Sequence, residues 1–325
     1  MRILSGVQPT GALHIGNYFG AIRQFVALQD DPGNECFYFL ADLHALTSIR
    51  EGSQVRAHSF EVAVSFLALG LDPQRSVLYR QSDVPEVTEL AWMLSNVTPM
   101  GLLQRCHSFK DKTARGITPN HGLFAYPVLM AADILIVRAD HVPVGKDQKQ
   151  HLEVTRDIAG AFNATFGDGL LTVPTEIILP DVAVVPGVDG QKMSKSYGNT
   201  LDIFAPEKEI RKRFMAIVSD STPVAEPKPM RGNTLYALLK LFTPASDWPE
   251  ARRLFSEGGT GYGDIKKRLF GLFLETFAPA RRRHEDLLRD PGFVHQVLRE
   301  GRERAMAVIS DVMADCRRAC GLGWQ

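Results

Sequence analysis

Apolar and polar residues alternate in two different rhythms along the first part of the chain. Short apolar runs rich in aromatic or β-branched residues are typical of buried strands, and apolar residues recurring every three or four positions are typical of amphipathic helices. Because the two kinds of segment alternate, the pattern predicts βαβ units and a parallel sheet. The expected strands are Arg2–Val7, Cys36–Leu40, Ser76–Arg80 and His141–Val144. The expected helices lie at 15–26, Gln54–Leu69, Val87–Leu94, Tyr126–Leu135 with Pro127 in its first turn, and about 148–162.

The pattern changes after about Asp202, where no further strand is expected. Helical periodicity dominates from there on, and it is broken by Glu226–Pro229 and Gly258–Gly263. The expected helices are Glu207–Met215, Thr234–Leu241, Trp248–Ser256, Asp264–Phe277, Pro279–Arg289 and Phe293–Cys316. The chain is therefore expected to form an α/β domain over residues 1–204 and an all-helical domain over residues 205–325.

The charge balance narrows the classes of function. The 325 residues carry 37 Lys and Arg against 37 Asp and Glu, which excludes a polycation that grips nucleic acid with its whole surface. It does not exclude a local basic patch. Lys208, Arg211, Lys212 and Arg213 form one basic cluster, and Arg281–Arg283 form another. Each cluster is either a solvated face or a contact for nucleic acid.

The sequence pattern predicts neither secretion nor membrane insertion. Apolar runs such as Ile134–Val137 are too short to span a bilayer, and Met1–Gly6 shows no apolar stretch before a cleavage site. The four cysteines favour a reducing compartment, so we expect a cytoplasmic protein. Cys316 and Cys320 are spaced to face one another on a helix, but no cysteine spacing typical of a metal site occurs. We expect inert thiols and no metal held by the protein's own side chains.

The first segment whose residues suit ligand binding runs from Leu4 to Asn17. Its pattern predicts a strand, a loop and the N-terminus of a helix. Backbone N–H groups at such a junction face an anion, so this design suits phosphate binding. It is not a P-loop, because Asn17 follows Gly16 where that motif has lysine. We expect His14 in the first turn of the helix, where its imidazole can reach a phosphate oxygen, and Gly16 leaves room for a flat ring.

The second such segment is Val188–Ser196, which contains Lys192 and Lys195 three positions apart among glycines and serines. An ammonium group is a compact charge that can follow a moving phosphate, so the segment suits a mobile loop closing on a polyphosphate. The alternative is a solvated basic turn.

Together these segments resemble the two signatures of the class I aminoacyl-tRNA synthetases. His14–Asn17 is similar to the first signature, with Asn17 in place of its last histidine, and Lys192–Ser196 is similar to the second. Tyr126–Leu135 and Val142–His151 resemble the bacterial-type tryptophanyl branch of that family, as does the opening Ser5–Gly11. The resemblance covers nearly the whole chain.

One face of the segment 126–135 agrees with that branch. Tyr126, Met130 and Asp133 are spaced i, i+4, i+7 and share one side of a helix. They offer an aromatic wall, a soft thioether and a carboxylate, and an indole needs apolar walls and one acceptor for its N–H. The alternative for Asp133 is a structural bond to the backbone or to an arginine.

The resemblance also implies residue roles, carried over position by position. The expected ATP-binding residues are Gln8, Pro9, Thr10, Gly16, Asn17, Gly145, Lys146, Asp147, Val184, Lys192, Met193, Ser194, Lys195 and Ser196. The expected tryptophan-binding residues are Leu4, Gly6, His44, Tyr126, Met130, Asp133, Ile134, Val142, Val144 and Gln148. The expected catalytic residues are His14, Asn17, Lys112, Lys192 and Lys195. From the sequence alone, His44 is either a pocket residue or a packed histidine.

The resemblance implies a Rossmann-type nucleotide-binding domain followed by a helical domain that binds the tRNA anticodon region. It implies ATP-dependent activation of L-tryptophan with Mg²⁺, transfer to tRNA(Trp), and a homodimer with residues 92–133 at its interface. Three alternatives stay open at this point: a tyrosyl-tRNA synthetase, a paralogue that binds adenylates without charging tRNA, and an unrelated nucleotidyltransferase.

Overall fold

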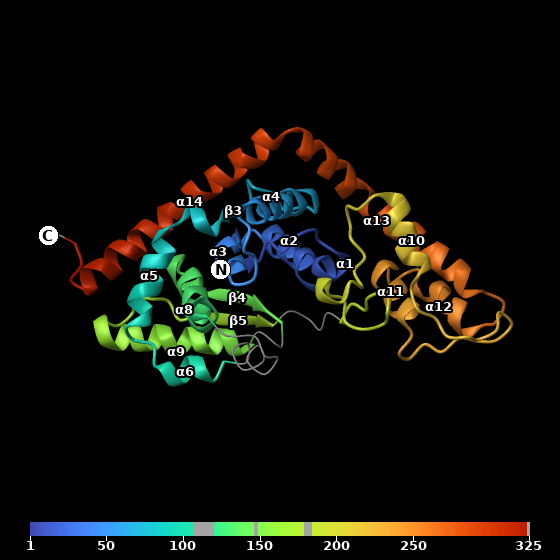
Figure 1. The fold of residues 1–325 in the computed structure, drawn as a ribbon, viewed down its shortest axis with the longest axis horizontal. Coiled ribbons are helices and arrows are strands. Elements are labelled where there is room, and N and C mark those ends of the chain that lie inside the picture. Colours follow the sequence, from blue (N-terminus) through green and yellow to red (C-terminus); the bar gives the residue numbers. More distant parts are fainter. Residues whose placement is uncertain (107–119, 146–148, 179–183, 324–325) are drawn as a thin grey trace.

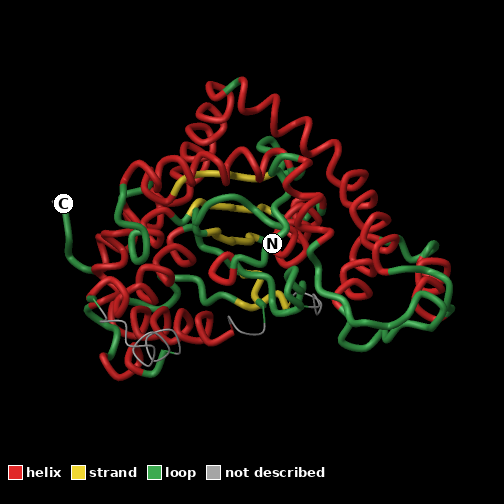
Figure 2. The backbone as a smooth tube through the Cα atoms, turned by 45° about the vertical axis from the view of Figure 1, so that its right-hand side comes forward, coloured by secondary structure: helices red, strands yellow, loops and turns green. Residues whose placement is uncertain are grey.

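The computed structural model describes residues 1–106, 120–145, 149–178 and 184–323. Five parallel strands form one sheet in the order β3-β2-β1-β4-β5, which confirms the predicted α/β class. The strands are β1 (Arg2–Val7), β2 (Glu35–Leu40), β3 (Ser76–Arg80), β4 (His141–Val144) and β5 (Thr175–Ile178). Strand β5 was not among the expected strands. Figure 2 shows the strands side by side with helices on both faces.

Residues on alternate positions of the strands enter two separate cores. Ile3 and Tyr38 point to one face, where they pack with Phe66, whereas Leu4 and Phe37 point to the other. This follows from the two-residue repeat of a strand, and it explains why the strands are apolar almost throughout.

The elements around the sheet are α1 (Ile15–Asn17), η1 (Tyr18–Ile22), α2 (Arg23–Asp30), α3 (Asp42–Ala45), α4 (Gly52–Ala68), η2 (Gln81–Asp83), α5 (Glu86–Ser95), α6 (Met100–Gln104), α8 (His121–Ile136) and α9 (Lys149–Phe166).

Helix α8 differs from its predicted start. It begins at His121, where the side-chain oxygen of Asn120 accepts a 2.8 Å hydrogen bond from the Leu123 amide, so Pro127 lies inside the helix and not in its first turn. The cap outweighs the proline as a start signal, because a side chain that satisfies a free N–H stabilises the first turn directly. The proline is tolerated at the cost of one backbone hydrogen bond.

The chain after residue 202 forms helices, and all the named strands precede it. These helices are α10 (Glu207–Met215), α11 (Thr234–Phe242), α12 (Trp248–Ser256), α13 (Tyr262–Arg289) and α14 (Pro291–Ala319), with a short turn η4 (Lys195–Tyr197) before them. The two helices predicted on either side of residue 278 are one continuous helix, α13, with Pro279 inside it. None of the helices in the described part of the chain meets the length and hydropathy needed to cross a bilayer.

The last helix returns to the sheet. Helix α14 runs along the edge strand β3 (Figure 1), and a Cβ added to Gly301 would lie 1.8 Å from the carbonyl oxygen of Leu78. Beyond Gly301, the side chains of Ile309 and Met313 enter the core beneath β2 and β3. The helix therefore covers a strand edge that would otherwise expose unpaired backbone groups. The domain boundary at 204/205 stays a prediction, and α14 packs against the first of the two predicted domains.

Candidate active site

The strand order locates a crevice. The chain runs outward from β1 to β3 on one side and then returns to β4 on the other, so the order reverses between β1 and β4. In open α/β sheets, ligands bind at the carboxyl ends of the strands beside such a reversal. Each of the four strands β1 to β4 is followed by a segment with polar residues or glycine at that end of the sheet. Thr10 and His14 follow β1, Asp42 and His44 follow β2, Gln81 follows β3, and Gly145 follows β4.

His14 lies at the mouth of this crevice as the residue that precedes α1. It was expected inside the first turn, but it is the N-cap, and its backbone N–H donates to Oδ1 of Asn17 at 3.1 Å. His14 is 6% exposed, and its Nδ1 has no hydrogen-bond partner among the residues that the structure describes. Burial, assisted by the charge of Lys195, lowers its pKa to about 4 against a smaller opposing effect of Asp202. The imidazole is therefore neutral at physiological pH, and its Nδ1 can form a hydrogen bond with a ligand.

Gly16 marks the place where the two signature segments meet. A Cβ on this residue would lie 2.9 Å from Nδ1 of His14 and 3.5 Å from Cβ of Met193. A larger residue would therefore push the imidazole out of position. Glycine at this position thus allows the two segments to lie in contact. The expected room for a flat ring beside Gly16 stays a prediction.

Residues 186–200, which we call the lysine loop, fold back toward the first signature. Pro186 and Lys192 form an isolated bridge across the loop, and the Met193 side chain, 5% exposed, is anchored in the core that also holds Leu13 and Ile15. Nζ of Lys195 lies 3.5 Å from Oγ1 of Thr10. Burial lowers the pKa of Lys195. A partly desolvated ammonium so close to the first loop is well placed for an anionic ligand, because its charge is less screened than in water.

A second polar group lies at the ends of β2 and β3. Both oxygens of Asp133 accept from Nε2 of Gln81, at 2.8 and 2.9 Å, and Oδ2 is also 2.9 Å from Nε2 of His44. Gln81 in turn accepts the backbone N–H of Leu43 at 3.1 Å. Burial raises the pKa of Asp133, while the bonds from His44 and Gln81 oppose this rise. Within the described part of the chain, the partners of this carboxylate are His44 and Gln81, and not the backbone or an arginine, which were the structural alternatives.

Gln81 was not predicted from the sequence. It is 1% exposed and is the first residue after strand β3, so its position at the carboxyl end of a strand was the available signal. His44 and Asp133, by contrast, were predicted and are brought together by α3 and α8.

The apolar residues of β1, β4 and α8 that were predicted for the tryptophan site belong to one core. Leu4 is 1% exposed and belongs to the core, and Val142, Val144 and Ile134 are also buried within it. A Cβ on Gly6 would lie 2.4 Å from the ring of Phe39, so glycine is required there. Leu4 is thus part of the core, and its contact with tryptophan stays a prediction.

Tyr126 closes one side of the group. Its ring makes edge contacts with His44, at 6.4 Å between centroids, and with His151 at 5.9 Å. Met130 is half-buried on the same helix. Among the remaining predicted site residues, Val184 is 64% exposed, and Lys112, Lys146, Asp147 and Gln148 lie outside the described residues.

Comparison with known proteins decides the family. A family model described as class I tRNA synthetases (W and Y) matches residues 1–269. The tryptophan–tRNA ligase of Rhodopirellula baltica is 52% identical over 322 residues, covering 99% of this chain and 100% of the relative. The crystal structure of tryptophanyl-tRNA synthetase from Campylobacter jejuni complexed with ADP and tryptophan superimposes with a TM-score of 0.93 at 46% identity, covering 99% and 100% of the two chains.

The chain belongs to the class I tRNA synthetases for tryptophan and tyrosine. Within this family its relatives at 42–52% identity are tryptophan–tRNA ligases, among them that of Fusobacterium nucleatum at 49%. Structures of tyrosyl-tRNA synthetases, such as that from Archaeoglobus fulgidus at 21% identity, share the fold.

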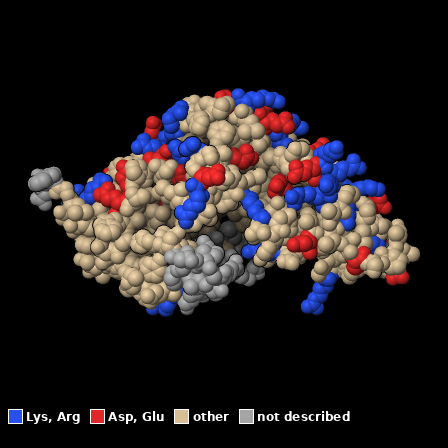
Figure 3. All heavy atoms as spheres, in the orientation of Figure 1, with Lys and Arg blue, Asp and Glu red and all other residues tan. Residues whose placement is uncertain are grey.

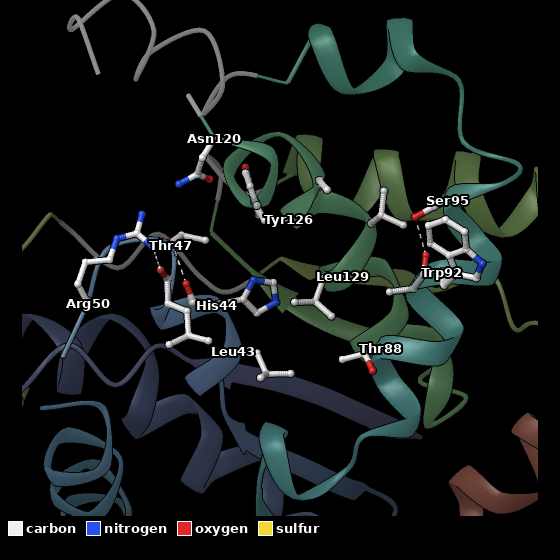
Figure 4. A pocket seen from close by; sticks show the side chains of 15 residues that line it. Leu43, His44, Thr47, Arg50, Thr88, Trp92, Ser95, Asn120, Tyr126 and Leu129 are labelled. Carbon is white, nitrogen blue, oxygen red and sulfur yellow. Dashed lines mark hydrogen bonds between the residues drawn. The ribbon is translucent and has the colours of Figure 1, made fainter. Parts of the chain in front are cut away.

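The synthetase has a cavity of about 460 Å³ beside the crevice, between α3, α5 and α8. Figure 4 shows His44 and Leu129 facing one another near its centre, with Arg50 at one end and Trp92 at the other. Trp92 is 72% exposed, so it is a surface residue of the single chain. The cavity borders the polar group through the shared residue His44.

The two basic clusters of the synthetase contain both side chains that bind the backbone and side chains that are exposed. Arg213 donates to the carbonyl oxygens of Gly198 and Thr200, and Arg281 donates to that of Ile203. Arg211 and Lys212 are exposed. Figure 3 shows Lys and Arg side chains, interspersed with Asp and Glu, over the outer slope where Figure 1 places α10 and α13.

Proposed function

We propose that this synthetase is a tryptophan–tRNA ligase. It would activate L-tryptophan with ATP, giving tryptophanyl-adenylate and pyrophosphate, and then transfer the tryptophanyl group to tRNA(Trp) in the cytoplasm. The proposal depends on one observation: two different sites lie at the carboxyl ends of the strands of one sheet. One site, His14, Thr10 and Lys195, suits a polyphosphate, and the other, Asp133 with His44 and Gln81, suits an aromatic ring with one N–H.

In the first step, the carboxylate of tryptophan attacks the α-phosphorus of ATP and pyrophosphate leaves with the bonding electron pair. No protein nucleophile is needed, so catalysis consists of positioning and charge stabilisation. The neutral imidazole of His14 would donate an N–H to a phosphate oxygen. The ammonium of Lys195 would stabilise the negative charge that develops on the leaving pyrophosphate, because its burial at the crevice strengthens that interaction.

Asp133 would receive the indole N–H. The Gln81 and His44 bonds hold the carboxylate in place and stabilise its charge, which leaves an acceptor lone pair for the ligand. A phenyl ring offers no donor, so a buried carboxylate left without a partner would disfavour it.

Mg²⁺ would accompany ATP. The described residues contain no group of three acidic, histidine or cysteine side chains that could hold a metal ion, so the ion would be bound mainly by the phosphates and water. When bound, it supplies positive charge to the triphosphate. Lys195 and His14 would complement that charge from the protein side.

Two further parts of the proposal concern partners. The exposed basic residues of α10 and α13 support contact of the helical part with the tRNA anticodon region. A homodimer with residues 92–133 at its interface is supported by Trp92 and Met100, which are 72% and 62% exposed on neighbouring helices.

The test is pyrophosphate exchange with each standard amino acid in turn, followed by charging of tRNA. Exchange that depends on tryptophan, together with charging of tRNA(Trp), is the expected result. Exchange with tyrosine instead would favour the tyrosyl branch, and exchange without charging would point to an adenylate-forming paralogue.

A variant checks the role of the lysine loop. Lys195→Ala should lower kcat for exchange while the Kd for tryptophan stays near that of the wild type, since this lysine is assigned to charge that develops in the transition state. Loss of tryptophan affinity would instead place the loop against the amino acid and contradict the role.

A further inference from the structure

One asparagine closes the lysine loop from inside. Asn199 is 2% exposed. Its Oδ1 accepts the backbone N–H of Ser194 at 2.8 Å, and its Nδ2 donates to Oδ1 of Asp189 at 2.8 Å and to the carbonyl oxygen of Lys192 at 3.1 Å. The side chain thus bonds on both sides of the segment that carries the two lysines. Both hydrogens of the amide nitrogen have acceptors in the loop, and the amide oxygen accepts from it as well.

The opposite arm of the loop is built around the same side chain. A Cβ on Gly187 would lie 2.3 Å from Cγ of Asn199, so only glycine allows the arm to pass this close. The backbone N–H of Val188 also donates to the carbonyl oxygen of Asn199 at 3.0 Å. The amide therefore lies between the two arms and sets their separation.

The segment that carries this asparagine is itself fixed from outside. Arg213 of α10 donates to the carbonyl oxygens of Gly198 at 3.0 Å and Thr200 at 3.1 Å, one residue on either side of Asn199. Gly198 has a positive φ of 63°, which ends the turn η4 directly before the asparagine. The position of Asn199 is thus tied to the helical part of the molecule.

We propose that Asn199 is the positioning residue of the lysine loop: it keeps the loop in the shape that points Lys195 at Thr10 and the first signature. The inference rests on the proposed function and adds to it a buried residue that is not among the expected ATP-binding or tryptophan-binding residues. If the role is one of positioning, disturbing Asn199 changes how well the lysines meet the transition state. It leaves the tryptophan site, on the other side of the crevice, unchanged.

A pair of variants tests this. Asn199→Asp keeps an oxygen for the Ser194 N–H but places a carboxylate 2.8 Å from Oδ1 of Asp189. The like charges repel and spread the loop. A displacement of about 1 Å near reacting groups can cost about 100-fold in rate, so we expect a fall in kcat for exchange of about 10- to 100-fold with the tryptophan KM little changed. Oδ1 of Asp189 also accepts the Gln191 backbone N–H at 3.0 Å, so Asp189→Asn in the same chain keeps that acceptor, removes one of the two like charges and should recover part of the lost kcat.

A matched control separates positioning from general stability. Asn163 also bonds across a loop, with Nδ2 to the Leu171 carbonyl oxygen and Oδ1 to the Leu171 N–H, both at 2.9 Å. That loop precedes the start of β5, at the opposite end of the sheet from the crevice. Asn163→Ala should lower Tm without the loss of kcat. Equal kcat for Asn199→Asp and Asn163→Ala, or no recovery in the double variant, would overturn the proposal.

Hydrogen–deuterium exchange of the purified protein gives a second readout that does not depend on tryptophan. Peptides covering residues 187–200 should exchange faster in Asn199→Asp than in the wild type and slow again in the double variant. If the wild type fails to exchange pyrophosphate with tryptophan, the proposed function is wrong. Unchanged protection of these peptides in Asn199→Asp would show instead that the asparagine does not hold the loop.

Discussion

The buried imidazole of His14 makes the stability of the fold depend on pH. In the unfolded chain this group takes up a proton near pH 6.5, whereas in the folded protein burial, with help from the Lys195 charge, holds its pKa at about 4. The unfolded state therefore binds more protons between these values, and the free energy of unfolding falls as the pH is lowered from 6.5 toward 4. Above pH 6.5 the group has no effect. Each pH unit corresponds to about 1.4 kcal/mol, so at pH 4 the loss reaches at most about 3 kcal/mol.

Urea unfolding at about pH 7 and about pH 4.5 measures this loss in the wild type and in His14→Gln, which cannot titrate. The wild type should lose about 2 kcal/mol more than the variant between the two pH values. His121→Gln removes an exposed imidazole from the first residue of α8 and is the control. If His14→Gln loses as much stability as the wild type, burial does not keep this imidazole neutral, and its assignment as a neutral donor fails.

Three further predictions concern other parts of the molecule. Asp133→Asn should raise the tryptophan KM in pyrophosphate exchange about tenfold or more with little change for ATP, because the amide replaces one acceptor oxygen by an NH2 donor that faces the Gln81 amide and loses the charge; an unchanged tryptophan KM would refute the pocket. Gly301→Ala should lower the stability by about 1–3 kcal/mol, because its Cβ would meet a β3 carbonyl, whereas Gly271→Ala, open on α13, should not; thermal unfolding measures both. Replacing Arg211 and Lys212 by Ala should impair tRNA charging in a salt-dependent way and spare exchange, and equal damage to both reactions would remove the tRNA role.

The long apolar strands could be predicted because burial on both faces leaves them with continuous apolar sequences. Strand β5 was missed because it has four residues, Thr175–Ile178, of which two are polar. It lies at the sheet edge beside β4, and its pairing is decided by tertiary contact. The continuous helix α13 was divided at Pro279 for a similar reason. Packing of Phe273 and Phe277 stabilises the helix enough to tolerate an internal proline.

The residues of the candidate site could be predicted where they belong to a short sequence motif or share one face of a helix. His14 and Lys195 stand in short segments with recognisable order, and Tyr126, Met130 and Asp133 follow from helical periodicity. The residues that hold these groups could not be predicted in this way. Gln81 and Asn199 are ordinary polar residues in sequence, and only the fold shows that each is buried with its amide fully engaged.

The basic clusters show why the charge pattern alone leaves the nucleic-acid question open. Neighbouring residues of one helix have different roles. Arg213 binds backbone carbonyl groups of the lysine loop, whereas Arg211 and Lys212 face solvent. On α13, Arg281 likewise binds the carbonyl of Ile203. A variant that removed all the basic residues would loosen the loop and damage both reactions at once. A test of tRNA binding must therefore leave Arg213 and Arg281 in place, because only the exposed cations can be lost without disturbing the geometry that both steps require.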